Sequence, residues 1–395
     1  MNSRLRHWRE AATVLLAAGG VGPACGGASA RLPGALASSS SSPPPSFDYE
    51  LLLLRRSAGS GFMPGAYVFP GGTVDAADFS AEWLQLLPEP PPRCGLGPVK
   101  GPRAPLFATE RSELGGSPLP GDVAFRICAI RETFEEAGVL LLAPAAEGGR
   151  PGPACDGSPA RLLPAERLPP ASELAEWRRR VQRQPGAFLQ LCRHLRCVPN
   201  IWALHEWSNW LTPAGRGGRR FDTAFYLCCL GQSPPPASHD QAEVTACKWT
   251  KPSEAIELFK SQDIWIPPPQ FYELCRLCNF PSLRDLHRFG FERAVEGCER
   301  WMPVLLIASD GFMQILPGDE LYPEDPDFTG ERKLTLSTNK KTEDVLKEAI
   351  RLHRVVIQDL NKIAIHVNIP SKYKHINPLP LDSKMGNSTD CSSKL

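Results

Sequence analysis

The feature that most constrains the fold of this chain is the segment RETFEEAGV at residues 131–139. It places Glu132, Glu135 and Glu136 close together, and Gly138 ends the run. Side chains three and four residues apart share one face of a helix, so the carboxylates lie together if this segment is helical. Glycine suits the left-handed residue that often ends a helix. The segment therefore predicts a helix whose last turn carries a concentrated negative charge.

The residues before the acidic run extend the predicted helix back to Asp122. Apolar side chains recur there at a spacing of three to four, which indicates one buried stripe. The stripe consists of Ile127, Ile130, Phe134 and Ala137. The run VLLL at 139–142 follows and is typical of a buried strand. One helix face is therefore expected to be buried and a neighbouring face to carry the carboxylates.

The charge arrangement of this helix favours a bound cation. Three like charges in one turn repel each other, and they lie at the negative end of the helix dipole. Mg²⁺ removes that conflict, because it prefers oxygen ligands and usually takes few carboxylates together with water and substrate phosphates. Arg131 is placed to pair with Glu135 at a separation of four residues. The alternative is an acidic helix surface without a ligand.

The pattern R-E-x-x-E-E-x-G resembles the second half of the Nudix box, G-x5-E-x7-R-E-U-x-E-E-x-G-U, in which U is apolar. Thr133 stands at an apolar position, a mild departure because threonine carries a methyl group. The first half of the box is absent at the expected spacing. Val123 stands where the pattern has glutamate, and Ser117 where it has glycine. The resemblance therefore requires a displaced first half.

A candidate for that first half is the sequence FPGG at 69–72, after which Asp78 takes the place of the glutamate. An insertion at about 80–121 would separate this loop from the helix, and closing a longer loop costs little extra entropy. Gly71 and Gly72 permit a tight turn that brings N–H groups near phosphate oxygens. The alternative is that FPGG is a plain turn.

The segment LLLLRRSAGSGFMPGAYVFPGG at 51–72 is similar to the sequence that precedes the box in Nudix hydrolases acting on coenzyme A (CoA). This resemblance implies the Nudix fold, an α/β (α+β) architecture with a mixed β-sheet between helices. It also implies an enzyme that uses Mg²⁺ or Mn²⁺ to hydrolyse the diphosphate bond of CoA and acyl-CoA. The products would be adenosine 3′,5′-bisphosphate and (acyl-)4′-phosphopantetheine.

The resemblance also assigns roles to residues. Glu132 and Glu136 correspond to metal ligands, and Glu135 to a further ligand or a base. A base outside the box is expected at Glu243, for which the alternative is a solvated loop acid. The box and its loop include Gly71, Gly72, Arg131 and Gly138, and substrate contacts are expected at Arg55, Arg56 and Phe69. Two tryptophans are candidates either to stack on adenine or to pack in the core, namely Trp207 and Trp210.

The sequence is also compatible with two alternative functions. One keeps the fold and changes the substrate to NADH or another nucleoside diphosphate derivative. The other is a catalytically impaired Nudix-like module that binds CoA or a nucleotide. Rates on CoA, acyl-CoA and NADH distinguish the substrates, and a glutamine at position 136 distinguishes an enzyme from a binding module.

The net charge and the cysteine spacing limit which partners and which cellular compartment are expected. Lys and Arg number 44 and Asp and Glu number 43, so no global field favours nucleic acid. The 13 cysteines lack the spacing of a disulfide framework, which favours a reducing compartment. Zinc binding is a weak alternative for two loose clusters, Cys275 with Cys278 and Cys192 with His194 and Cys197, because it usually takes four ligands. No apolar run is long enough to span a membrane.

Composition divides the chain, because Pro, Gly and Ser gather in a few stretches. The expected organisation is a hydrolase domain over 1–280 with loop insertions at about 21–46, 80–121 and 143–171, a C-terminal extension over 281–390, and a targeting signal at 393–395. Ser393, Lys394 and Leu395 form a peroxisomal import signal, which predicts an import receptor as partner and the peroxisome matrix as location. The basic first nine residues suggest a mitochondrial alternative, although the same region fits a first strand better.

Overall fold

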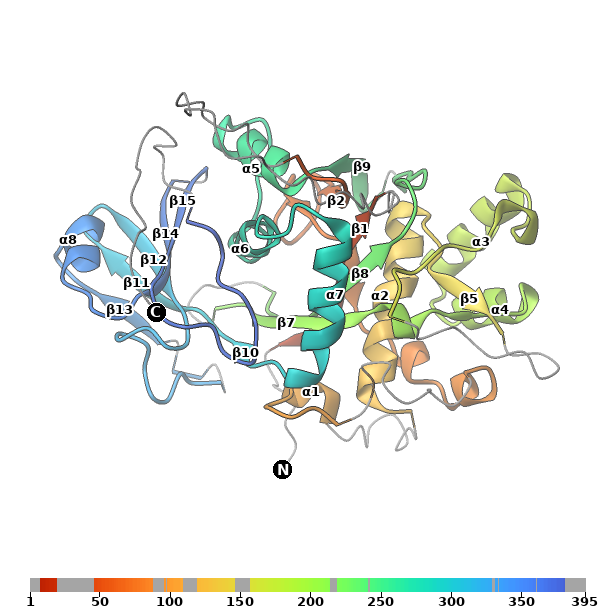
Figure 1. The fold of residues 1–395 in the computed structure, drawn as a ribbon, viewed down its shortest axis with the longest axis horizontal. Coiled ribbons are helices and arrows are strands. Elements are labelled where there is room, and N and C mark those ends of the chain that lie inside the picture. The colour runs from red at the N-terminus through yellow and green to blue at the C-terminus, as the bar shows by residue number, and fades with distance from the viewer. Residues whose placement is uncertain are drawn as a thin grey trace, which may run out of the picture.

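The computed structural model (Figure 1) describes residues 8–19, 46–87, 96, 98–108, 119–145, 157–213, 219–240, 242–328, 331–332, 334–359 and 361–380. Within them, one large mixed sheet follows the order β10-β7-β8-β1-β2-β3, with β4 paired to β1 and β9 paired to β2. Its strands are β1 (Arg9–Ala18), β2 (Glu50–Arg56), β3 (Tyr67–Val68), β4 (Gly71–Thr73), β7 (His205–Leu211), β8 (Phe221–Leu230), β9 (Val244–Thr250) and β10 (Arg300–Trp301). The central pair β1 and β8 is parallel, whereas β1 and β2 are antiparallel. The expected mixed sheet is thus confirmed.

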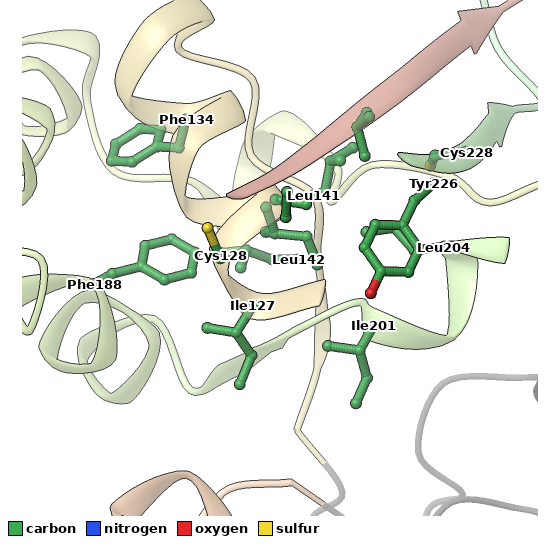
Figure 2. Close-up of a cluster of buried hydrophobic side chains, with 14 of the residues drawn as sticks. Ile127, Cys128, Phe134, Leu141, Leu142, Phe188, Ile201, Leu204, Tyr226 and Cys228 are labelled. Atoms are coloured by element: carbon green, nitrogen blue, oxygen red, sulfur yellow. The ribbon is translucent and has the colours of Figure 1, made fainter. Parts of the chain in front are cut away.

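The large sheet buries both faces, because β1 alternates between two cores. Ala12, Val14 and Leu16 pack on one side, and Leu15 and Ala17 pack on the other. Helices α2 (Gly121–Ala137), α3 (Ala171–Arg183) and α4 (Ala187–His194) belong to the first side. Figure 2 shows this core, where apolar side chains of α2 meet residues of α4 and β8. A short pair, β5 (Leu142–Pro144) and β6 (Cys197–Pro199), completes this layer.

The second side of the sheet is covered by α5 (Pro252–Lys260), α6 (Pro268–Leu277) and α7 (Leu283–Arg293). A separate sheet of the order β13-β11-β12-β14-β15 follows. It comprises β11 (Val304–Ala308), β12 (Gly311–Ile315), β13 (Thr335–Ser337), β14 (His353–Asp359) and β15 (Lys362–Val367), with α8 (Thr342–Lys347) before β14. In Figure 1 this sheet lies at the left, and α7 stands between it and α2. Leu316, Val355 and Ile365 join the same core as α6, so the C-terminal sheet packs on the hydrolase domain.

Several predicted elements are confirmed. The helix expected from Asp122 is present. Pro185-Gly186, a pair that breaks helices, separates α3 from α4, and Asp310-Gly311, a hairpin signature between two apolar runs, lies at the turn from β11 to β12. The strand alternative for the N-terminal region is confirmed from Arg9, where β1 begins, and residues 1–7 lie outside the described residues. Helix α1 (Pro105–Ala108) and a 3₁₀ helix at Ala81–Gln85 lie within the expected insertion. Among the described residues, no helix is long and apolar enough to cross a membrane.

Three sequence patterns predict their elements only in part. The apolar spacing over 342–360 predicts one helix, but α8 ends at Lys347 and β14 follows it, so the second half of this prediction is wrong. The β-branched run at Val355 to Ile357 favours a strand, which is buried against β12 and β15. The run at 139–142 is buried, but only Leu142 is in a strand. The aromatic-rich run at 201–213 is typical of a strand, and β7 confirms this from His205 to Leu211, after a 3₁₀ turn at Ile201–Ala203.

Candidate active site

The acidic helix α2 ends as its sequence predicts. Gly138 has φ 72° and ψ 6°, and its N–H donates to the carbonyl of Phe134 at 2.9 Å. A left-handed glycine lets the chain leave the helix without a Cβ clash. Thr133, the departure from the apolar pattern, is fully buried, and its hydroxyl donates to the carbonyl of Ala129 at 2.7 Å. The threonine therefore fits inside the core without an unpaired polar group.

The expected buried face of α2 is confirmed, and the burial extends to part of the acidic turn. Arg131 is 2% exposed and Glu136 is 4% exposed. The short strand β4 and the 3₁₀ helix Ala76–Phe79 also lie against α2. The acidic turn is therefore held against β4, with Glu136 buried and Glu132 and Glu135 partly exposed.

Arg131 joins the displaced loop to the helix. Its Nε lies 2.8 Å from Oδ1 of Asp78, and its Nη2 lies 2.9 Å from Oδ2. Asp78 is 1% exposed, and its side chain also accepts from the backbone N–H of Asp75 in a capping box. A bidentate pair of this kind fixes both partners in orientation. The spacing from Gly72 along the sequence predicts Asp78 as a residue of the box, but its pairing with Arg131 depends on the three-dimensional structure.

The same guanidinium orients two of the glutamates. Nη1 of Arg131 lies 2.6 Å from Oε1 of Glu135 and 2.9 Å from Oε1 of Glu132. The ion pair between Arg131 and Glu135 was predicted from their separation along the helix, and it is confirmed. One buried arginine thus holds Asp78, Glu132 and Glu135 at once, so the loop and the acidic turn form a single unit.

The two glycines of the FPGG sequence bring β4 against the glutamates. The N–H of Gly71 donates to Oε2 of Glu136 at 2.8 Å, with a φ of 152° that favours glycine. A Cβ on Gly72 would lie 2.4 Å from the carboxylate carbon of Glu132. The glycines were expected to bring N–H groups toward phosphate, but the Gly71 N–H serves a glutamate. Glycine is therefore needed at both positions for close approach.

Burial, with mutual repulsion added to it, raises the pKa values of the three carboxylates. Burial raises the pKa of Glu132 to about 7, with repulsion from Glu135 and Asp78 adding to it and Arg131 opposing it. Burial and the neighbouring Glu132 raise the pKa of Glu136 well above its usual range, although the Gly71 N–H opposes the shift. Burial also raises the pKa of Glu135, against the effect of Arg131. A cation bound here would relieve that repulsion.

The carboxylates fit a metal that is shared with a substrate. Oε2 of Glu132 and Oε1 of Glu136 form no hydrogen bond within the described part of the chain, so each is available as a hard oxygen ligand. In that part, no group of three or more His, Cys, Asp or Glu side chains is arranged to hold a metal alone. Mg²⁺ needs no such group, because it commonly takes one or two carboxylates plus phosphates and water.

A cleft of about 740 Å³ contains these glutamates. It is also lined by Glu243, Arg56 and Phe69, whereas Arg55 is exposed and lies outside it. Successive side chains of a strand point to opposite sides, so only one of the two arginines of β2 reaches the cleft. A cation that the sequence did not suggest, Arg219, lies on the wall next to Gly61.

The two tryptophans of β7 belong to a buried polar network. Their indole N–H groups both donate to the carboxylate of Glu273 at 2.7 Å, as does the hydroxyl of Ser208. Trp207 is fully buried and packs in the core. Trp210 is 3% exposed and also lines the cleft. Of the two adenine-stacking candidates, only Trp210 reaches the site, and Glu273 fixes its ring.

The cysteine clusters carry no described metal site. Cys192, Cys197 and Cys275 are buried free thiols, and Cys278 is partly exposed. His194 pairs with Glu173 at 2.9 Å instead of turning toward the cysteines. Burial raises the pKa of Cys278 to about 12, as expected for a thiol packed among apolar side chains. These side chains act as core residues.

The mixed sheet, the FPGG loop and the acidic helix that it contacts together define a Nudix hydrolase. Residues 8–277 match the family model described as the NUDT19 Nudix domain, and residues 305–368 match the NUDT19 C-terminal domain. The chain belongs to the NUDT19 family of Nudix hydrolases, and divalent metals are general in such enzymes.

Named relatives cover nearly the whole chain. The sequence is 63% identical to "Acyl-coenzyme A diphosphatase NUDT19" of Gallus gallus, over 98% of this chain and 99% of the relative. It is 50% identical to the protein of the same name in Homo sapiens, over 96% and 97%. It is 26% identical to "Putative nudix hydrolase 7" of Caenorhabditis elegans, over 69% and 70%. A crystal structure of a NUDIX hydrolase from Alicyclobacillus acidocaldarius aligns with a TM-score of 0.45 and 21% identity, over 71% of this chain and 95% of that one.

Proposed function

We propose that this chain hydrolyses the diphosphate bond of CoA and acyl-CoA with Mg²⁺ or Mn²⁺, giving adenosine 3′,5′-bisphosphate and (acyl-)4′-phosphopantetheine. The observation that carries the proposal is the single cleft in which the acidic turn of α2 meets the wall lined by Arg56 and Arg219. The near full-length relatives named as acyl-CoA diphosphatases support the same substrate class. In cells, this activity would regulate peroxisomal CoA levels.

Glu132 and Glu136 would hold the metal through the two oxygens that form no hydrogen bond within the described residues. A metal in this position lowers the pKa of water and neutralises phosphate charge. The protein contributes the fixed geometry. Arg131 and the Gly71 N–H each bind one oxygen of a carboxylate and leave the other directed to the ligand.

Glu243 is the favoured general base. Its carboxylate forms no hydrogen bond or ion pair within the described residues, whereas Glu135 is paired with Arg131 at 2.6 Å. Glu243 lines the same cleft as Glu135 and Glu136, and its charge contributes to the raised pKa of both, which supports a place near the acidic turn. A base must reach the attacking water and remain free to accept a proton. Glu135 then acts as a positioning partner or a further ligand.

Arg56 and Arg219 are the proposed contacts for the phosphates. The guanidinium of Arg56 donates to Ser60 Oγ and to the carbonyl of Phe62 at 3.0 Å, which holds it at the cleft. Its charge opposes the raised pKa of Glu136, so it lies near the acidic turn. Phe69 is 2% exposed and acts as wall and core together.

The experiment that tests the substrate is a comparison of steady-state rates on CoA, acetyl-CoA and NADH with Mg²⁺, Mn²⁺ or EDTA. Mass spectrometry identifies the products. We expect metal-dependent formation of adenosine 3′,5′-bisphosphate from both CoA substrates at a kcat/KM well above that for NADH. A clear preference for NADH would contradict the proposal.

We also propose import into the peroxisome through Ser393, Lys394 and Leu395, which lie outside the described residues. Expression of the full chain with and without these three residues tests the address by fluorescence microscopy. Punctate peroxisomal signal should become diffuse when they are removed. Mitochondrial signal in the truncated chain would instead favour the basic N-terminus as an address.

A further inference from the structure

The cleft extends from the acidic turn over the second face of the large sheet to the C-terminal sheet. Its lining includes Thr223 and Trp210 of that face, the first turn of α6, and Gln314 on β12. Gln314 lies between Phe312 and Leu316, which share its side of β12 and pack on the hydrolase core. The C-terminal sheet therefore forms part of the cleft wall.

Two amide side chains in this part of the cleft have unmet hydrogen-bonding capacity. Oε1 of Gln314 and Oε1 of Gln270 are buried and form no hydrogen bond within the described residues. Gln314 is only 9% exposed, so water is a poor substitute for a partner. A buried polar group without a partner costs stability, and a ligand that completes it gains affinity. Both side chains line the cleft, so a ligand there can satisfy them.

The part of the cleft around Gln270 and Gln314 is chemically suited to an uncharged ligand group that carries amides. Its neighbours are Trp210, the two prolines that begin α6, and Pro303 just before β11, which provide apolar contact. The two glutamines contribute no charge. The pantetheine arm of CoA is uncharged and carries two secondary amides, each with one donor and one acceptor. The nucleotide half carries a 3′-phosphate and fits the arginine-lined wall better.

We propose that Gln270 and Gln314 form a pantetheine subsite, in which the C-terminal sheet determines specificity for CoA-type substrates; this rests on the proposed function. The two glutamines hydrogen-bond the amides of the arm while the diphosphate lies at the acidic turn. The residues are specificity determinants and do not touch the reacting phosphorus. A substrate without the arm, such as NADH, leaves both amides unpaired and binds more weakly for that reason.

The test separates the two halves of the substrate. Gln270→Met and Gln314→Met keep side-chain volume and remove the amide, and Gln358→Met on the exposed side of β14 is the matched control. Calorimetry measures binding of 4′-phosphopantetheine and of adenosine 3′,5′-bisphosphate in Mg²⁺. We expect the Kd for 4′-phosphopantetheine to rise roughly tenfold in each variant, the effect of one lost hydrogen bond. The Kd for adenosine 3′,5′-bisphosphate should stay within twofold.

Other outcomes overturn the inference in distinct ways. If both folded variants bind 4′-phosphopantetheine as the wild type does, the subsite proposal is refuted and the proposed function is unaffected. Loss of adenosine 3′,5′-bisphosphate binding alone would place the adenine at the glutamines instead. A wild-type protein that binds 4′-phosphopantetheine but does not hydrolyse CoA would contradict the proposed function, not the subsite. Gln270 is half-buried at a helix start, so its variant should fold even if that of Gln314 does not.

Discussion

At the scale of single residues, Arg131 determines the geometry of the site. It is buried, it binds Asp78 in a bidentate pair, and its remaining nitrogen reaches Glu132 and Glu135. Glu136 is held separately by the Gly71 N–H. The two candidate metal ligands are thus anchored by different elements, and each keeps one oxygen for a ligand.

Replacement of Glu136 by glutamine should abolish most activity without loss of the fold. The amide oxygen can still accept from Gly71, but the negative charge and one hard oxygen ligand are lost. We expect kcat for CoA to fall by orders of magnitude while binding of the substrate is kept. The matched control is Glu82→Gln at an exposed position, which should behave as wild type. Wild-type activity in Glu136→Gln would favour the binding-module alternative.

His205 predicts a pH dependence of stability. Neither ring nitrogen has a partner within the described residues, and burial lowers its pKa to about 3, with His287 and Arg126 adding to the shift. The unfolded chain binds a proton below pH 6.5 whereas the folded chain does not, so this residue lowers stability as pH falls. The free energy of unfolding of His205→Leu minus that of the wild type should therefore be larger, meaning a relatively more stable variant, by about 1.4 kcal/mol at pH 5.5 than at pH 7.5. Denaturant titrations at the two pH values measure it, and an equal difference at both would refute the assignment.

At the scale of elements, the contact between β4 and α2 replaces the sequence continuity of the box. The FPGG loop and the helix are separated by an insertion, yet Gly71 and Gly72 contact the carboxylates of α2. The three glutamates of the acidic turn need fixed spacing, and all of them lie on helix α2. The FPGG loop is held to α2 by side chains of the helix. An insertion between the two is tolerated because closing a longer loop costs little extra entropy.

Gly72→Ala tests this contact. The new Cβ would lie 2.4 Å from the carboxylate of Glu132, which must move away from its position beside Arg131. We expect weaker activation by Mg²⁺, by about tenfold in concentration, with a small loss of stability; a misplaced ligand costs affinity on that order. Gly59→Ala, elsewhere in the cleft with only a contact at 3.7 Å, serves as the control. Equal activation in both variants would show that Gly72 is not needed for close approach.

The sequence predicts elements with strong local signals and fails where tertiary contacts decide. The acidic helix, its glycine end and the Arg131–Glu135 pair follow from spacing along one helix. The segment after Lys347 reads as helix by its apolar periodicity, but pairing with β12 and β15 makes it a strand. The partner of Asp78, the cleft residue Arg219 and the amides of the glutamines depend on distant segments, and local sequence carries no signal for them.

At the scale of the whole molecule, the C-terminal sheet and the hydrolase domain share one core. Tyr272 of α6 hydrogen-bonds His353 of β14 at 2.9 Å, and the N–H of Leu379 donates to the carbonyl of Cys275 at 3.2 Å. Val355 and Ile365 pack into the core that also holds α6. The C-terminal region therefore packs as part of the hydrolase body.

Removal of residues 303–395 should therefore abolish soluble expression rather than leave an active hydrolase domain. It uncovers the apolar side of α6 and deletes Pro303 and Gln314 from the cleft wall. Removal of 382–395 is the control and should leave solubility and activity unchanged. The soluble fraction and CoA hydrolysis measure both. A soluble, active truncation at 302 would show that the two parts fold independently.

The position of β1 in the large sheet has a consequence for how the protein is made. This strand begins at Arg9, and its parallel neighbour β8 begins at Phe221, so Arg9 pairs with Phe221 across most of the domain's length. Parallel pairing between distant segments is slow, because the loop must close before the contact stabilises anything. On the ribosome, an apolar strand made first stays without this partner until more than half of the chain has emerged. Nascent-chain aggregation, rather than equilibrium stability, is therefore the step at which chaperones matter most for this protein.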